Sequence, residues 1–277
     1  QVFFNAADGG SNQRGPKSAK TGPDGTFTAK GLQEGRYVLS AQAKGFLPGK
    51  NRTITVAPDG GRDFQISLEP GSSISGRVLS PSGEPVALAT VRPGISGSPN
   101  EGWDDRLGNI DSITAQTNAE GLYILEGLPA SKNYIVQASH KDYAAGRVPA
   151  IALGEREVLE GIDVRLTRGG SIRGRVTDEG GTGITGANLN ANPERSQDEN
   201  EQSMIRYGDS SGGQATTDSE GNYVLQHISE GTYTVQAQTR DRLSASREKV
   251  AVGEDRITEK IDFVLAEGES ISGRVVD

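Results

Sequence analysis

One seven-residue pattern occurs three times in this chain of 277 residues. It reads Ser-Ser-Ile-Ser-Gly-Arg-Val at 72–78, Gly-Ser-Ile-Arg-Gly-Arg-Val at 170–176 and Glu-Ser-Ile-Ser-Gly-Arg-Val at 269–275. The central glycines, Gly76, Gly174 and Gly273, stand 98 and 99 residues apart. A repeat of this period indicates an array of similar domains, each large enough to bury a core of its own. The shared part is called the Ser-Ile-x-Gly-Arg-Val motif below.

A second pattern recurs at a fixed place between the motifs. It joins a threonine to an acidic residue, a glycine and an aromatic residue, as in Thr21-Gly-Pro-Asp-Gly-Thr-Phe27, Thr117-Asn-Ala-Glu-Gly-Leu-Tyr123 and Thr217-Asp-Ser-Glu-Gly-Asn-Tyr223. The Asp-Gly and Glu-Gly pairs predict hairpin turns, because glycine readily adopts the positive φ that tight turns require. Runs such as Tyr134-Ile-Val-Gln-Ala138 alternate with period two, which is typical of half-buried strands. Since no convincing amphipathic helix is present, we predict an all-β chain.

These markers divide the chain into three units and a tail. We expect a first β-sandwich at 1–70 that lacks its N-terminal strand, a second at 71–169, a third at 170–268, and the first strand of a further domain or a donor strand at 269–277. Only three or four residues separate the last strand of one unit from the next motif, as in Glu69-Pro-Gly71 and Thr167-Arg-Gly-Gly170. Linkers this short keep neighbouring domains close together. We therefore predict a semi-rigid rod.

Composition excludes several classes of function. The 29 Lys and Arg against 37 Asp and Glu give a net charge of −8, which opposes binding to nucleic-acid phosphates. No apolar run is long enough to span a bilayer, so we expect no membrane insertion. Nucleophilic catalysis has few candidates, because the chain has no cysteine, no Gly-x-Ser-x-Gly elbow and only two histidines. We predict that the protein is not an enzyme.

One short motif is reminiscent of a metal site. His227-Ile-Ser-Glu230 has the His-x-x-Glu spacing with which a zinc carboxypeptidase presents two ligands. Alignment of the repeats gives it another explanation, because Glu230 matches Glu34 and His227 matches Gly127 in ordinary turns. The other histidine, His140, lies between a strand and a loop. We therefore predict no zinc site.

The repeated patterns together resemble a known family. Four patterns in order are similar to those of the carboxypeptidase regulatory-like domain. They are the motif, the Gly83-Glu-Pro-Val86 turn after it, the Thr-x-x-Asp/Glu-Gly-x-Tyr pattern and a later Gly-x-Tyr-x-Val. The resemblance covers essentially the whole chain apart from the variable loops. It implies a tandem array of seven-stranded antiparallel, transthyretin-like β-sandwiches, related in shape to immunoglobulin domains. It also implies spacers, stalks or accessory modules in bacterial surface and secreted proteins, and no peptidase activity.

Departures from the family pattern are local. The third unit has Gly183-Ile-Thr185 where Pro-Val is expected, and His227 replaces the turn glycine. The second unit has one extra residue before Tyr134. None of these changes the expected fold.

Polar loops in the second and third units are the candidate binding sites, because sandwiches place binding function on loops. Their candidate side chains are Trp103, Asp104, Asp105 and Asp111 in one loop and Asp198, Glu199 and Glu201 in the other. The carboxylates could supply the oxygen ligands of Ca²⁺, the one candidate cofactor, although the spacing is not that of an EF-hand. Trp103 could stack on a glycan. The alternatives, which we favour, are a solvated acidic loop and a tryptophan packed on its own domain.

The sequence therefore favours a structural role. We expect a segment of a long extracellular or cell-surface protein of a bacterium, forming a stalk, fibre or adhesin shaft from end-to-end sandwiches. The alternatives are a carbohydrate- or calcium-dependent binding module and the accessory domains of a secreted hydrolase.

The two ends of the chain suggest how the array continues. The chain lacks an initiator methionine, and Gln1-Val-Phe-Phe4 aligns with Leu88-Ala-Thr-Val91, so we expect a piece of a longer protein. The motif strand missing from the first unit recurs as Ser270, Ile271, Ser272, Gly273, Arg274, Val275 and Val276. An incomplete sandwich exposes unpaired backbone groups, which a spare strand can complete. The expected partners are copies of the chain joined head to tail, or flanking repeats of the same chain.

Overall fold

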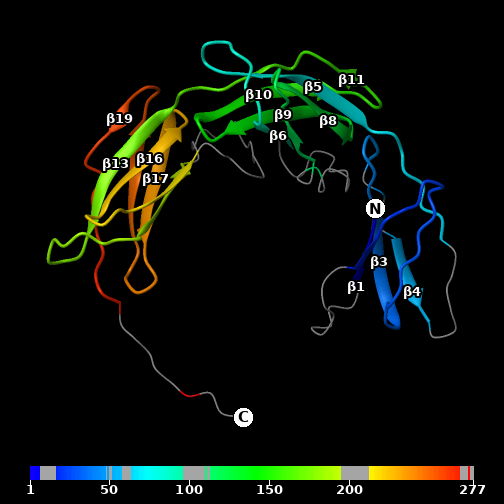
Figure 1. Ribbon diagram of the computed structural model, residues 1–277, viewed down its shortest axis with the longest axis horizontal. Helices are drawn as coiled ribbons and strands as arrows, with labels where there is room; N and C mark the ends of the chain where they lie inside the picture. Colours follow the sequence, from blue (N-terminus) through cyan, green and yellow to red (C-terminus); the bar gives the residue numbers. More distant parts are fainter. Residues whose placement is uncertain are drawn as a thin grey trace.

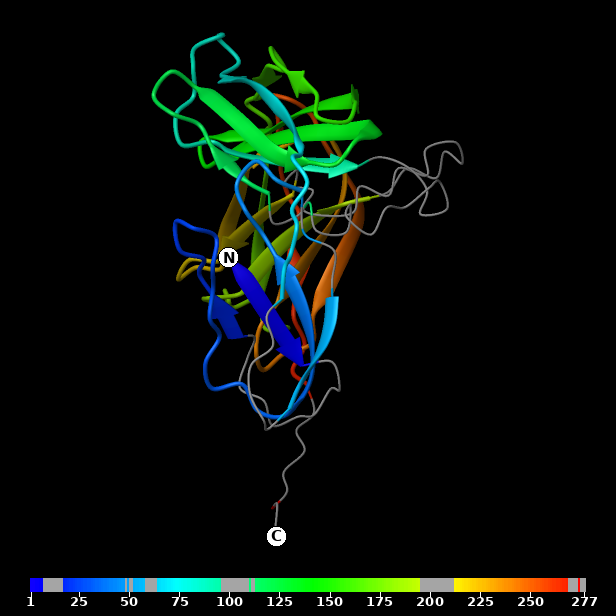
Figure 2. The same cartoon turned by 90° about the vertical axis from the view of Figure 1, so that its right-hand side faces the viewer.

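The computed structural model describes residues 1–6, 17–47, 49, 52–57, 64–95, 110, 113–194, 212–268 and 274. Its elements are β-strands, which confirms the all-β prediction. Within these residues no helix is long and apolar enough to cross a membrane. Figure 1 shows the three units following one another along a curved course, and Figure 2 shows the same arrangement from the side.

The first unit contains one four-stranded sheet. Its strands are β1 (Val2–Ala6), β2 (Lys17–Ala19), β3 (Gly35–Ala41) and β4 (Arg52–Val56), antiparallel in the order β2-β1-β3-β4. One face of this sheet buries a small apolar cluster made by Val2, Phe4, Tyr37, Leu39, Ala41 and Ile54.

The second unit is a complete sandwich of two sheets. Its strands are β5 (Ser72–Leu79), β6 (Thr90–Ile95), β7 (Ala115–Gln116), β8 (Leu122–Leu128), β9 (Ser131–His140), β10 (Tyr143–Leu153), β11 (Val158–Leu159) and β12 (Val164–Arg165). One sheet is antiparallel, in the order β10-β9-β6-β7. In the other sheet β5 is central, with β8 antiparallel to it and β11 and β12 parallel to it.

The third unit repeats this topology strand for strand. Its strands are β13 (Gly170–Thr177), β14 (Asn188–Pro193), β15 (Gly213–Thr216), β16 (Asn222–Ile228), β17 (Gly231–Gln238), β18 (Ala245–Val252), β19 (Ile257–Thr258) and β20 (Phe263–Val264). The antiparallel sheet has the order β15-β14-β17-β18, and β13 is central in the other. The described residues of each complete unit thus form eight segments rather than seven, because the edge strand beside the motif is broken into two pieces. That edge strand is parallel to the motif strand, which departs from the all-antiparallel sheet expected.

The motif forms the central strand of its sheet. Ile74 and Val78 of β5, and Ile172 and Val176 of β13, are fully buried on the inner face, as an alternating strand requires. The glycine between them is needed because the broken edge strand crosses it. A Cβ added to Gly76 would collide with the backbone carbonyl of Ile162. One added to Gly174 would collide with that of Ile261, the equivalent residue.

A tyrosine and an aspartate complete this contact. The hydroxyl of Tyr123 donates to the Ile162 carbonyl oxygen at 2.6 Å, and Oδ1 of Asp163 accepts the Arg77 backbone N–H at 2.9 Å. The carboxylate thus satisfies a donor that the break in the edge strand leaves without a ladder partner. The third unit repeats both bonds, from Tyr223 to Ile261 at 2.6 Å and from Arg175 to Asp262 at 2.8 Å. Burial, aided by the neighbouring carboxylate, raises the pKa of both tyrosines, so each hydroxyl remains a donor.

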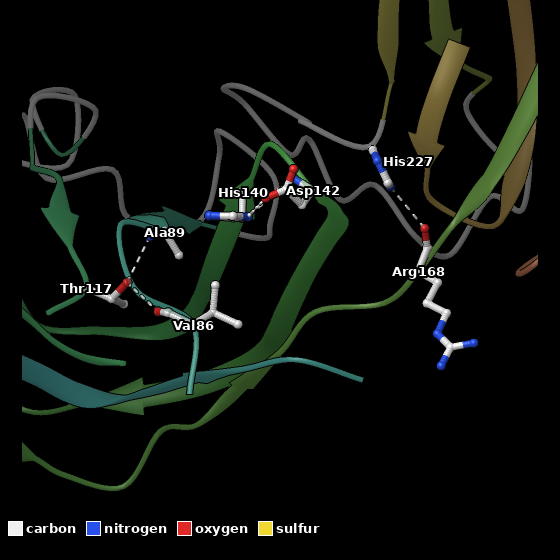
Figure 3. Close-up of polar contacts among 7 residues, drawn as sticks. All are labelled: Val86, Ala89, Thr117, His140, Asp142, Arg168 and His227. Atoms are coloured by element: carbon white, nitrogen blue, oxygen red, sulfur yellow. Dashed lines mark hydrogen bonds and ion pairs between the residues drawn. The ribbon is translucent and has the colours of Figure 1, made fainter. Parts of the chain in front are cut away.

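The threonine of the second pattern fastens the hairpin to the turn after the motif. Oγ1 of buried Thr117 donates to the Val86 carbonyl oxygen at 2.7 Å and accepts the Ala89 N–H at 2.8 Å, as Figure 3 shows. Thr217 makes the equivalent bonds to Ile184 and Ala187 at 2.6 and 2.9 Å. The matching Thr21 of the first unit is exposed. The first unit therefore differs from the other two at this position as well.

We predict that Gly76→Ala destabilises the second unit by at least about 2 kcal/mol, because the new methyl group has only backbone to displace. The matched control is Gly94→Ala in β6, where an added Cβ would meet only ordinary contacts at 3.8 Å, and whose effect should stay within about 1 kcal/mol. Hydrogen exchange in urea, read by mass spectrometry on peptides from β5 and β8, measures both. Equal effects would contradict this role of Gly76.

We predict that Thr117→Val lowers the free energy of unfolding of the second unit by about 2–4 kcal/mol, since two buried backbone groups lose their partner. Thr117→Ser keeps the hydroxyl and should cost only about 1 kcal/mol for the lost methyl group. The same exchange measurement compares the two variants. If the serine variant is as unstable as the valine variant, the hydroxyl bonds are not what stabilises this hairpin.

Candidate functional site

The described residues gather their most specialised contacts at the junctions between units. At the first junction, Gly71 of the linker lies against Gly127 at the end of β8, so that a Cβ on Gly71 would be 2.5 Å from the Gly127 Cα. Gly127 has a φ of +78° and lies against the first unit, where an added Cβ would be 2.5 Å from the Phe46 carbonyl oxygen. The N–H of Gly71 donates to the Gly45 carbonyl oxygen at 3.0 Å. Backbone therefore meets backbone across this junction.

The second junction has the same construction. Gly169 lies against both the second and the third unit. A Cβ added to it would be 2.6 Å from the Ala144 Cβ of the second unit and 2.5 Å from the Ile228 carbonyl oxygen of the third. The N–H of Asp255 in the third unit donates to the Gly169 carbonyl oxygen at 2.9 Å. A linker glycine at the same alignment position thus sits between the units at both junctions.

The start of each linker is held by the unit before it. The loop after the third strand of the antiparallel sheet forms a backbone bridge to the linker, through Phe46 and Pro70 in the first unit and Ala144 and Thr167 in the second. The third unit makes the equivalent bridge between Arg242 and Glu267. Both ends of each inter-unit linker are therefore bonded to a neighbouring unit.

Ion pairs at the junctions are on the surface. Lys44 of the first unit lies 3.0 Å from the Glu126 carboxylate of the second, and Arg168 lies 3.7 Å from that of Asp255. The Lys44 side chain is 84% exposed, and exposed pairs contribute only about 0–1 kcal/mol. Backbone contact rather than charge therefore dominates the junction.

The two histidines serve local contacts near the second junction (Figure 3). Nδ1 of His140 accepts the Asp142 N–H at 3.3 Å, and Nδ1 of His227 lies 3.5 Å from the Arg168 carbonyl oxygen. His227 has a φ of 56°, which confirms that it occupies the turn position of Gly127. Among the described residues, no group of three or more His, Cys, Asp or Glu could hold a metal ion.

The structure does not describe the binding residues expected from the sequence. Trp103, Asp104, Asp105, Asp111 and Asp198 are outside the described residues, as are Glu199 and Glu201. The strand at Ser270–Val276 is also outside them, except for Arg274, which is exposed. The calcium, glycan and strand-donor assignments therefore stay predictions.

Sequence reasoning missed the junction glycines as a site. Gly71 and Gly169 were visible as linker residues, and their recurrence just before each motif was the available signal. Their role could not be inferred, because a close approach between units involves segments that are distant in the sequence.

The fold and its junctions define a tandem array of β-sandwich modules. A model of the carboxypeptidase regulatory-like domain matches residues 2–69, 73–167 and 171–266. The chain belongs to this family, as the resemblance in its sequence implied, and domains of this kind are non-catalytic.

The solved structures that the chain resembles include three pilins. The minor pilin of Streptococcus agalactiae is 12% identical with a TM-score of 0.32, over 74% of this chain and 100% of that chain. A streptococcal ancillary pilin is 12% identical with a TM-score of 0.31, over 86% and 77%. The shaft pilin SpaA of Lactobacillus rhamnosus GG is 12% identical with a TM-score of 0.27, over 73% and 100%. Scores this low transfer no function, and no curated protein matches the chain.

We predict that Gly71→Ala opens the first junction while leaving the two cores intact, because its methyl group would collide with the backbone of Gly127 and Leu128 rather than with a core side chain. The amides of Leu47 and Gly71, which bond across the linker, should then exchange faster, and peptides from β3 and β8 should not. The control is Gly180→Ala in an exposed turn, where the nearest atom to an added Cβ is a side-chain oxygen at 3.3 Å. Unchanged exchange at Leu47 in the Gly71 variant would contradict a glycine-dependent junction.

Proposed function

We propose that this chain is a structural segment of an extracellular or cell-surface protein of a bacterium, in which end-to-end β-sandwiches form a semi-rigid, curved stalk or fibre. The proposed units are 1–70, 71–169 and 170–268. The observation that carries the proposal is the recurrence of one junction, with a linker glycine between backbone segments of both neighbours.

The contacts support a spacer with a set shape. A flexible tether would need no close approach between units, whereas Gly71 and Gly169 both make one. Each linker is also bonded to the unit before it, at Pro70 or Thr167. A spacer built in this way holds whatever lies beyond it at a fixed distance and direction.

Distances between spin labels test the proposed stiffness. Because the chain has no cysteine, Arg147→Cys and Glu248→Cys place one label each on exposed positions of neighbouring units. We expect a distance distribution about as narrow as that of the control pair Arg147→Cys and Glu120→Cys, which lies within one unit. A distribution several times broader than that of the control would overturn the semi-rigid stalk.

A further inference from the structure

The outer face of the antiparallel sheet in the third unit carries a group of side-chain amides. On its inner strands, β14 and β17, outward-facing residues alternate with buried ones such as Leu189 and Val235. Asn190 and Gln236 at the centre of the group are half-buried, and the others are exposed. We call this surface the amide face and define it by Asn188, Asn190 and Asn192 of β14, Gln214 of β15, and Gln236 and Gln238 of β17.

The strand register places the central amides in one row across the sheet. Asn190 lies opposite Gln214 on one side and opposite Gln236 on the other. Gln236 in turn lies opposite Ser246 of β18. This row crosses all four strands in steps of about 4.8 Å. Since neighbouring side chains on one face of a sheet lie this close together, a ligand along the row can contact several of them at once.

The fold does not require amides at these positions. Asparagine is disfavoured in strands, yet β14 has one at three successive outward positions. The second unit has the same topology with charged side chains in the equivalent row, Arg92 in place of Asn190 and Arg147 in place of Ser246. Among the residues that the structure describes, no hydrogen bond joins the amides to one another. A choice of residues that opposes strand propensity without serving the fold is expected at functional positions.

A carboxylate is held in place beside the amide face, just after β14. Oε1 of Glu194 accepts the Thr234 hydroxyl at 3.0 Å and the Lys249 backbone N–H at 2.6 Å, so the side chain reaches across β17 to β18. The Glu194 N–H donates to the Thr232 carbonyl oxygen at 2.8 Å. Oε2 has no hydrogen-bond partner within the described part of the chain, and it can accept a hydroxyl of a ligand.

The chemistry of the amide face restricts the class of partner. Phosphate-bearing partners require Lys or Arg, and the outward positions of β14, β15 and β17 hold neither. The centre of a protein–protein interface is enriched in aromatic residues, Met and Arg, and the same positions hold none of these. Amides and hydroxyls offer donors and acceptors without charge. An uncharged ligand rich in hydroxyls therefore complements both the charge and the hydrogen-bonding groups of this face.

We propose that the amide face binds an uncharged polysaccharide, whose hydroxyls exchange hydrogen bonds with the central row and donate to Glu194. Each of these bonds forms in competition with water and contributes little alone. Affinity therefore depends on several sugar units engaging successive side chains, and it should increase with the length of the polysaccharide. This site lies on a sheet, and it is separate from the Trp103 loop that the sequence suggested for a glycan.

The inference goes beyond the proposed stalk. The amide face belongs to the third unit alone and requires no set angle between units. Broad spin-label distances with retained polysaccharide binding would overturn the semi-rigid stalk only, and loss of binding with narrow distances would overturn the inference only.

Affinity electrophoresis of the full chain tests binding. Native gels contain a mixed-linkage β-glucan, a galactomannan or an arabinoxylan, and parallel gels contain alginate as a charged polysaccharide. We expect at least one neutral polymer to retard the chain and alginate not to retard it. Gln236→Ala should weaken the interaction about three- to tenfold, and the matched Gln226→Ala, on an exposed position of β16 in the other sheet, should leave it unchanged.

A second variant copies the row of the second unit. Asn190→Arg with Ser246→Arg introduces the side chains that stand at the equivalent positions, where the same topology accommodates Arg92 and Arg147. We expect this variant to lose retardation by the neutral polymer while the backbone amides of β14 and β17 exchange as before. If their exchange shows an unstable fold, the comparison of Gln236→Ala with Gln226→Ala decides.

Four outcomes would overturn the inference. They are the absence of retardation by every neutral polymer, equal retardation by alginate, equal effects of the two glutamine variants, and retained binding in a folded double arginine variant.

Discussion

The architecture of each complete unit depends on one contact, between the glycine of the motif strand and a carbonyl of the broken edge strand. Gly76 and Gly174 have no side chain at the place where that carbonyl lies. The contact lets the edge strand cross close to the central strand, and Tyr123 and Asp163 then satisfy the backbone groups that the break exposes. Two repeated sequence patterns about 50 residues apart thus form one hydrogen-bonded arrangement, which explains why they recur together.

Glycines that allow two backbone segments to approach each other closely also join the units. Gly71 and Gly169 bring neighbouring sandwiches into direct contact, and the bridges at Pro70 and Thr167 hold the linker to the unit before it. Close packing without long side chains leaves few rotamers to reorganise at these contacts. Exposed ion pairs such as Lys44 with Glu126 add little to this. The proposed stalk depends on these backbone contacts.

The first unit shows what the central strand contributes. Where β5 and β13 are present, the segments beside them are paired strands with buried side chains. Without an equivalent among the described residues of the first unit, 27–30 and 64–68 form no strand and Thr21 is exposed. Phe27, Phe64, Ile66 and Leu68 of these segments nevertheless pack on the first sheet.

The sequence by itself determined the period, the all-β class, the family and the turn role of His227, because these depend on local patterns and their recurrence. The resemblance implied seven antiparallel strands, whereas the tertiary structure has a broken edge strand parallel to the motif strand. Only the fold could show that Ile162 lies on Gly76, or that Gly127 touches Phe46, since the partners are 86 and 81 residues apart. A contact made by backbone atoms does not require a particular side chain from its partner, so the sequence gives no sign of which residue the partner is. A glycine's position can be read from the chain, but what approaches it is decided by packing.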